Sequence, residues 1–150
     1  MIKIKLVNQL PGDVEEKMRK DLGKYENSHG IDVNYQQFAL LLTNDRNEPI
    51  GVLNAYTAFA EVYIEDMWVD SRHRRLGYGK KLIEELENHF TNKGFNNINL
   101  VTSQFQAPEF YKNCGFTLEF VRKNNQNPKL TKYFFIKYFN KKLQLQGILR

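Results

Sequence analysis

Apolar residues recur along the chain at two spacings, one typical of strands and one of helices. Alternation at residues 2–6 predicts a first strand with one buried face. A helical spacing follows, with apolar positions at Val14, Met18, Leu22 and Tyr25. This helix is expected to end between Asn27 and Gly30, and Asp13 with Glu16 resembles a capping box at its start.

The later part of the chain predicts short strands separated by polar turns. Residues 31–37 are compatible with a short helix or a loop. Further strands are expected at residues 38–43, 51–59, 62–69, 97–102, 117–121 and 133–139.

The last predicted strand, residues 133–139, is apolar on both faces and is expected to be buried. The alternative is an aromatic platform for single-stranded nucleic acid, because several lysines lie close by in the sequence. Residues 140–150 permit an extended strand, a helical tail or a dimer contact.

The most informative stretch begins with the strand at residues 62–69 and runs through a basic loop into a helix. Apolar residues of this helix recur at Leu82, Ile83, Leu86 and Phe90. The helix is expected to end at Lys93-Gly94. A short strand at residues 97–102 and a short helix at residues 107–116 follow.

The start of the helix after residue 77 carries the wrong charge for a helix N-terminus. Arg74, Arg75, Lys80 and Lys81 lie where the helix dipole favours acidic residues, and each exposed cation costs roughly 0.3–1 kcal/mol there. A bound anion would remove this cost. Glycines at positions 77 and 79 also let backbone N–H groups approach a phosphate, so we predict a phosphate or pyrophosphate site.

Two common phosphate motifs do not fit this loop. A nucleotide-triphosphate loop needs Gly at position 74 and Ser or Thr at position 81, which are Arg74 and Lys81. A dinucleotide fingerprint needs a third glycine near position 82, which is Leu82.

The pattern Arg74-x-x-Gly77-x-Gly79, between a strand and an amphipathic helix, resembles the GNAT superfamily of acyl-CoA N-acyltransferases. A second family segment, Asn-x-x-Ala-x-x-Phe-Tyr-x-x-x-Gly-Phe, is matched downstream except that Gln104 replaces its asparagine. The matching residues are Ala107, Phe110, Tyr111, Gly115 and Phe116. The resemblance covers most of residues 1–139.

The resemblance implies a mixed α/β fold whose central, mostly antiparallel sheet is splayed at the cofactor site and flanked by helices. One domain would span residues 1–150, with residues 140–150 as an extension. The implied activity is direct transfer of an acetyl group from acetyl-CoA to a primary amine of a small molecule or a protein. The alternatives are a degenerate CoA-binding sensor or scaffold and a basic RNA-binding module.

By the same resemblance, coenzyme A would lie along the strand end and the basic loop. The pantetheine arm would pair with the backbone of Met67, Trp68 and Val69, with ordinary core packing as the alternative for the Trp68 side chain. The expected contacts beyond that strand are Arg74, Arg75, Leu76, Gly77, Tyr78, Gly79, Lys80 and Gln104.

The resemblance also suggests an acid and a base. Glu65 is the expected general base, since a partly buried carboxylate has a raised pKa. An exposed strand carboxylate and a structural hydrogen-bond acceptor are the alternatives for Glu65 itself. Asp66, which would point to the opposite face in a regular strand unless a bulge intervenes, and ordered water are the alternative bases. Tyr111 is the expected donor to the departing thiolate, with an ordinary core aromatic as the alternative.

The acceptor amine is not specified by the sequence. Its pocket is expected from residues 26–35, 56–61 and 124–132. The acidic residues that would attract a cationic amine are Glu26, Asp32, Glu61 and Glu65.

Composition narrows the remaining classes. A net charge of +5 permits nucleic-acid contact, but a phosphate-rich cofactor explains part of the excess, so no nucleic-acid partner is expected. The single cysteine, Cys114, fits a reducing compartment, and the three histidines lack metal-ligand spacing. Without a long apolar run or a signal peptide, we expect a cytoplasmic protein with no membrane contact and no metal, and a homodimer is compatible with the resemblance.

Overall fold

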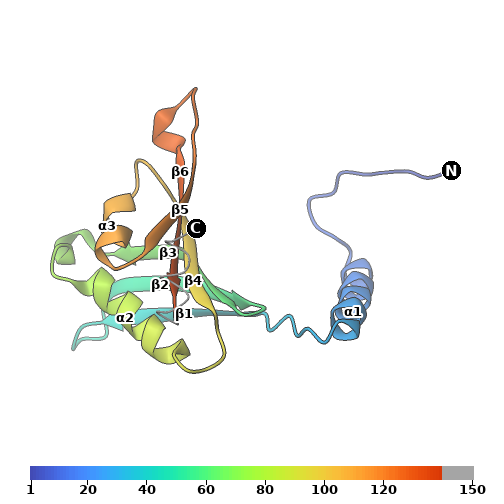
Figure 1. The fold of residues 1–150 in the computed structure, drawn as a ribbon, viewed down its shortest axis with the longest axis horizontal. Helices are drawn as coiled ribbons and strands as arrows, with labels where there is room; N and C mark the ends of the chain where they lie inside the picture. The colour runs from blue at the N-terminus through green and yellow to red at the C-terminus, as the bar shows by residue number, and fades with distance from the viewer. Residues whose placement is uncertain (140–150) are drawn as a thin grey trace. The chain divides into compact units, whose positions relative to one another are not determined.

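The computed structural model describes residues 1–139, and contacts divide the chain into two units, Met1–Val33 and Asn34–Arg150 (Figure 1). The predicted C-terminal extension, residues 140–150, lies outside the described residues.

The first unit contains one helix, α1 (Gly12–Ser28), which confirms the helical spacing of its apolar residues. The predicted capping box is wrong, because the N-cap is Pro11 and no side chain caps the helix. Asp13 instead lies in the first turn, where its charge favours the helix dipole. The strand predicted at residues 2–6 is also wrong, since residues 1–7 have no regular structure. Alternation describes a face for burial, but a strand also needs a partner edge.

The second unit is built on a six-stranded sheet in the order β1-β2-β3-β4-β6-β5 (Figure 1). Its strands are β1 (Gln36–Thr43), β2 (Pro49–Ala58), β3 (Glu61–Val69), β4 (Asn97–Ser103), β5 (Thr117–Arg122) and β6 (Lys132–Tyr138). Among the strands of residues 1–139, only the β3–β4 pair is parallel. This arrangement confirms the predicted mixed, mostly antiparallel sheet, while residues 31–35 form a loop.

Two helices lie on the same side of this sheet, α2 (Tyr78–Phe90) and α3 (Pro108–Asn113), as Figure 1 shows. The short 3₁₀ turns are η1 (Ser71–His73) and η2 (Pro128–Leu130). The apolar stripe of α2 is buried as predicted and packs with sheet residues such as Leu53, Val62 and Phe135. Burying a side chain of this size contributes about 1.5–3 kcal/mol, so this face anchors α2 to the sheet.

The sheet opens between β3 and β4. The two strands pair only at Glu61–Asn97, Val62–Ile98 and Tyr63–Asn99, although β3 continues to Val69 and β4 to Ser103. The predicted splay is therefore present. Beyond the last pair, the backbone groups that face the gap have no partner across it, and such groups need water or a ligand.

A bulge lies on the other edge of β3, just beyond the last residue that pairs with β4. Asn54 pairs with Asp66 while Ala55 pairs with Ile64, so Glu65 is an extra residue in β3. A bulge bends its strand and increases the local twist. The bend accompanies the departure of β3 from β4.

Lys137 connects β6 to both helices of this face. Its ammonium donates to Glu87 of α2 at 2.7 Å and to the carbonyl of Cys114, at the end of α3, at 2.9 Å. We expect Lys137→Met to lower the free energy of unfolding by about 1.5–3 kcal/mol, because two half-buried acceptors lose a charged donor. Urea denaturation measures the change. The exposed Lys93→Met is the matched control, and equal losses in both variants would contradict the assigned role.

Candidate active site

The loop after β3 is held by its own charged side chains. Asp70 accepts hydrogen bonds from the backbone N–H of Arg72 and from its guanidinium, both at 3.0 Å, and these bonds lower the pKa of Asp70. Arg74 donates from Nε to the carbonyl of Val69 at 3.1 Å. Two of the cations near the helix start therefore also fix the shape of the loop.

The N-terminus of α2 has no capping side chain. Gly77 is the N-cap residue with φ +84°, no side chain caps the helix, and its first turn contains no acidic residue. The first N–H groups of a helix have no partner inside the helix and lie at the positive end of its dipole. The N-terminus of α2 therefore has the features of an anion site.

Gly79 has a packing role in addition to its place in the loop. A Cβ atom at this position would lie 2.9 Å from the ring of Phe110. A side chain here would push α2 and α3 apart. The sequence predicted that Gly79 clears space for a ligand, and the structure shows that it also permits the close approach of the two helices.

A pocket of about 500 Å³ lies at the start of α2, between the end of β3 and α3. It is lined by Met67, Val69, His73, Arg74, Arg75, Gly77, Tyr78, Gly79, Lys80, Ala107 and Phe110. Most of the predicted cofactor contacts therefore share one cavity. The cavity is also lined by Ala107 and Phe110 of the second family segment and by His73 of the basic loop.

His73 supplies an unsatisfied polar atom at this pocket. Its Nδ1 is buried and has no hydrogen bond within residues 1–139. The nearest carboxylate oxygen, on Asp70, is 3.8 Å away, which is too long for a hydrogen bond. A buried polar atom without a partner is costly, and a polar ligand could satisfy it.

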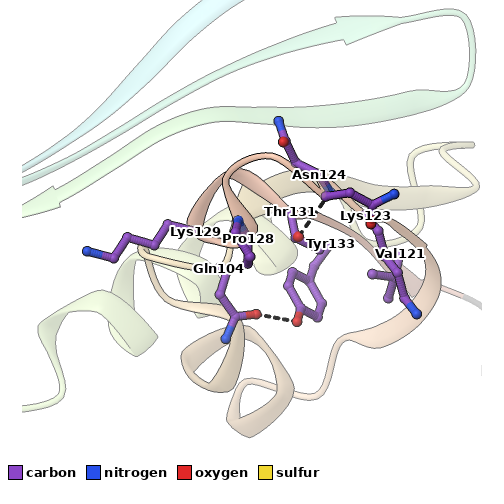
Figure 2. A pocket seen from close by; sticks show the side chains of 9 residues that line it. Gln104, Val121, Lys123, Asn124, Pro128, Lys129, Thr131 and Tyr133 are labelled. Carbon is purple, nitrogen blue, oxygen red and sulfur yellow. Dashed lines mark hydrogen bonds between the residues drawn. The ribbon is translucent and has the colours of Figure 1, made fainter.

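Three predicted contacts lie outside the pocket. Trp68 alternates with Met67 and Val69 along β3 and is 44% exposed, so its side chain neither lines this pocket nor packs in the core. Leu76 is exposed on the loop. Gln104 accepts a hydrogen bond from the Tyr133 hydroxyl and lines a different cavity (Figure 2).

The bulge in β3 leaves both candidate bases exposed. Asp66 accepts a hydrogen bond from Asn54 at 3.3 Å. Burial and then the nearby charge of Glu65 raise the pKa of Tyr56. Because Asn54 and Tyr56 are two residues apart on β2, they share a face. The expectation that Glu65 is partly buried is wrong, since this bulge residue is exposed.

Tyr111 lies on the other side of the sheet, among core aromatic residues. It is 8% exposed and packs against Phe116 and Phe135. Burial raises the pKa of Tyr111 to about 12, so its hydroxyl stays protonated at neutral pH. The hydroxyl has no hydrogen-bond partner within the described residues, and it remains available as a donor.

Known proteins share the fold of this chain. A model of the Acetyltransferase (GNAT) family matches residues 7–116. An acetyltransferase structure from Bacillus cereus ATCC 14579 is 26% identical, with a TM-score of 0.71 over 89% of this chain and 97% of that one. An Agrobacterium tumefaciens structure described as an acetyltransferase is 20% identical, with a TM-score of 0.75 over 91% and 99%.

A third structure was solved with its cofactor. It is an aminoglycoside 6'-N-acetyltransferase complexed with coenzyme A, 15% identical, with a TM-score of 0.59 over 93% of this chain and 98% of that one. Among curated proteins, no sequence matches this chain significantly.

The fold and the pocket define an acyltransferase of the mixed α/β type. The chain belongs to the GNAT acetyltransferase family. Within residues 1–139, no helix is long and apolar enough to cross a membrane. In the same part of the chain, no group of His, Cys, Asp and Glu side chains is arranged to hold a metal ion.

Gly77 and Gly94 provide a matched pair of glycines. Both have φ near the left-handed region, +84° and +86°, and a Cβ on either would meet open space. We expect Gly77→Ala and Gly94→Ala to lower stability similarly, by about 1 kcal/mol, because both strain the backbone. Only Gly77→Ala should weaken coenzyme A binding in calorimetry. Equal affinities in the two variants would exclude the N-terminus of α2 as the site.

Cys114 tests the packing beneath α3. Its side chain is buried, and burial raises the pKa of this thiol above its ordinary 9.0. The folded state keeps the thiol neutral, so its contribution to stability is present below pH 9.0 and declines as pH rises.

We expect Ellman's reagent at about pH 8 to label Cys114 slowly in the native protein and rapidly in urea. Cys114→Ser should show no labelling in either state. Fast labelling of native protein would contradict the burial.

Proposed function

We propose that the chain transfers an acetyl group from acetyl-CoA to a primary amine. The observation that carries this proposal is the pocket where the unpaired end of β3 meets the uncapped N-terminus of α2. One end of the pocket suits a pyrophosphate and the other borders backbone that lacks a strand partner. A coenzyme A molecule has a pyrophosphate and an amide-containing arm in this order.

The proposed contacts follow from these two ends. The pyrophosphate is held by N–H groups of residues 75–80 at the positive end of α2, with Arg74 and Lys80 supplying charge. The pantetheine arm pairs with the backbone of residues 67–69 in the manner of an added strand. In this arrangement Trp68 contributes through its backbone alone.

In the proposed reaction, the amine nitrogen forms a bond to the acetyl carbon while the carbon–sulfur bond breaks. The nitrogen must first be neutral, because an ammonium ion with a pKa near 10.4 has no free electron pair. Glu65, reached through water, takes the proton from the amine. The Tyr111 hydroxyl donates to the departing thiolate, and its raised pKa keeps this proton in place.

The gap between β3 and β4 supports this division of roles. Glu65 is exposed and lies on β3 two residues beyond the last residue paired with β4. Tyr111 lies on the face covered by α2 and α3. An acyl group in the gap would be open to an amine from one face while the thiol remains on the other.

A single domain, a homodimer and a cytoplasmic location stay predictions.

A thiol-release assay across amino acids, polyamines, aminoglycosides and lysine peptides tests the activity. We expect acetyl-CoA to release free thiol with at least one class. Glu65→Gln should lower kcat/KM about 100-fold, which is the usual size of a general-base contribution. Tyr111→Phe should lower kcat about 10-fold, because a donor to a charged leaving group is lost.

Asp66→Asn is the matched control for the base. A large loss in Asp66→Asn alone would assign the base to Asp66, and small losses in both variants would favour ordered water. A rise in melting temperature with coenzyme A, without turnover of any amine, would instead show a sensor. Failure of coenzyme A to bind folded protein would refute the proposal.

A further inference from the structure

A second cavity, of about 480 Å³, lies between the β4–α3 loop and the β5–β6 hairpin (Figure 2). It shares no lining residue with the pocket at the start of α2. The two cavities border different ends of the same loop, because Gln104 lines one and Ala107 the other. The sequence predicts residues 124–132 as part of the acceptor pocket, but the reaction steps proposed above use no residue of this second cavity.

The walls of this cavity are held by hydrogen bonds between the loop and the hairpin. The N–H of Gln104 donates to Thr131 at 2.9 Å, and the N–H of Phe105 donates to Lys129 at 3.2 Å. Within the hairpin, the N–H of Asn124 donates to the Thr131 hydroxyl at 3.2 Å (Figure 2). The cavity therefore exists before any ligand binds, which is typical of small-molecule sites.

The apolar lining comes from Val121, Pro128 and the ring of Tyr133. The Tyr133 hydroxyl already donates to the Gln104 side chain, as Figure 2 shows, so its ring is fixed in place. The lining offers an apolar surface for the body of a ligand.

The charges around this cavity have one sign. Lys123 and Lys129 line it, on opposite sides of Tyr133 in Figure 2, and no carboxylate lines it. The hairpin segment 122–132 contains lysine and arginine but no acidic residue. Within residues 1–139, neither lysine forms an ion pair. Their charges are therefore available to a ligand.

We propose that this cavity binds a small organic carboxylate, with its apolar body on Val121, Pro128 and Tyr133 and its charge attracted by the ammonium groups of Lys123 and Lys129. A lysine ammonium group is a compact point charge, which suits a compact monoanion. A cationic ligand would be repelled by both ammonium groups, and a neutral one would gain nothing from them. The proposal rests on this cavity alone and does not depend on acetyl transfer.

Three probes with one apolar body test the proposal: 4-phenylbutyrate, 4-phenylbutanol and 4-phenylbutylamine. Amide NMR shifts of residues 121–133 during titration report binding at this cavity. We expect the carboxylate to bind about 10-fold more tightly than the alcohol, and the amine to bind most weakly.

Charge variants identify the lysines. Lys123→Gln with Lys129→Gln should weaken the carboxylate about 10-fold and leave the alcohol unchanged. The matched control, Lys20→Gln with Lys93→Gln, removes the same charge from exposed positions and should change neither. Lys123→Arg with Lys129→Arg should retain the preference. Val121→Phe should weaken both probes by filling the apolar floor.

Three results would overturn the proposal. Equal affinity for carboxylate and alcohol would remove the role of charge. Equal losses in the lysine variant and its control would show a general electrostatic effect. Displacement of the probe by coenzyme A would make the cavity part of the cofactor pocket. Coenzyme A affinity, measured separately, decides the proposed acetyl transfer independently of these results.

Discussion

The parting of β3 from β4 is the constraint on which the rest of the site depends. A parallel pair normally shares hydrogen bonds along its whole overlap, and here the ladder stops after Tyr63 and Asn99. Two residues further along, the extra residue Glu65 bends β3, while the pairing of β3 with β2 continues to Val69. One edge of the strand is therefore held by β2 and the other is left for a ligand.

The sequence predicted the strand order correctly where strands that are adjacent in sequence also pair with each other. Strands β1 to β3 alternate clearly and are separated by short turns, so their neighbours in sequence are also their neighbours in space. Residues 2–6 show the same alternation and form no strand. Alternation indicates which side chains would be buried in a strand. Pairing also depends on the free edge of another strand, which the local sequence does not specify.

The candidate site was predictable to the extent that it is continuous in sequence. Residues 74–80 form one loop and helix start, so locating one residue located the others. Side-chain direction was harder to predict. Gln104 occupies a family position, yet the hydroxyl of Tyr133, far away in sequence, fixes it at another cavity. Residues 124–132 were expected to border the acceptor pocket, but this hairpin has no periodicity, so the sequence did not predict that it shares a cavity with Gln104.

The contact between Gly79 and Phe110 couples the position of the α2 N-terminus to the position of α3. Phe110 rests on the first turn of α2, and its neighbour in α3 is Tyr111. The distance between α2 and α3 therefore affects both the position of the α2 N-terminus and the position of the Tyr111 side chain. A larger residue at position 79 would displace Phe110 and with it the neighbouring Tyr111, so these positions constrain each other's evolution.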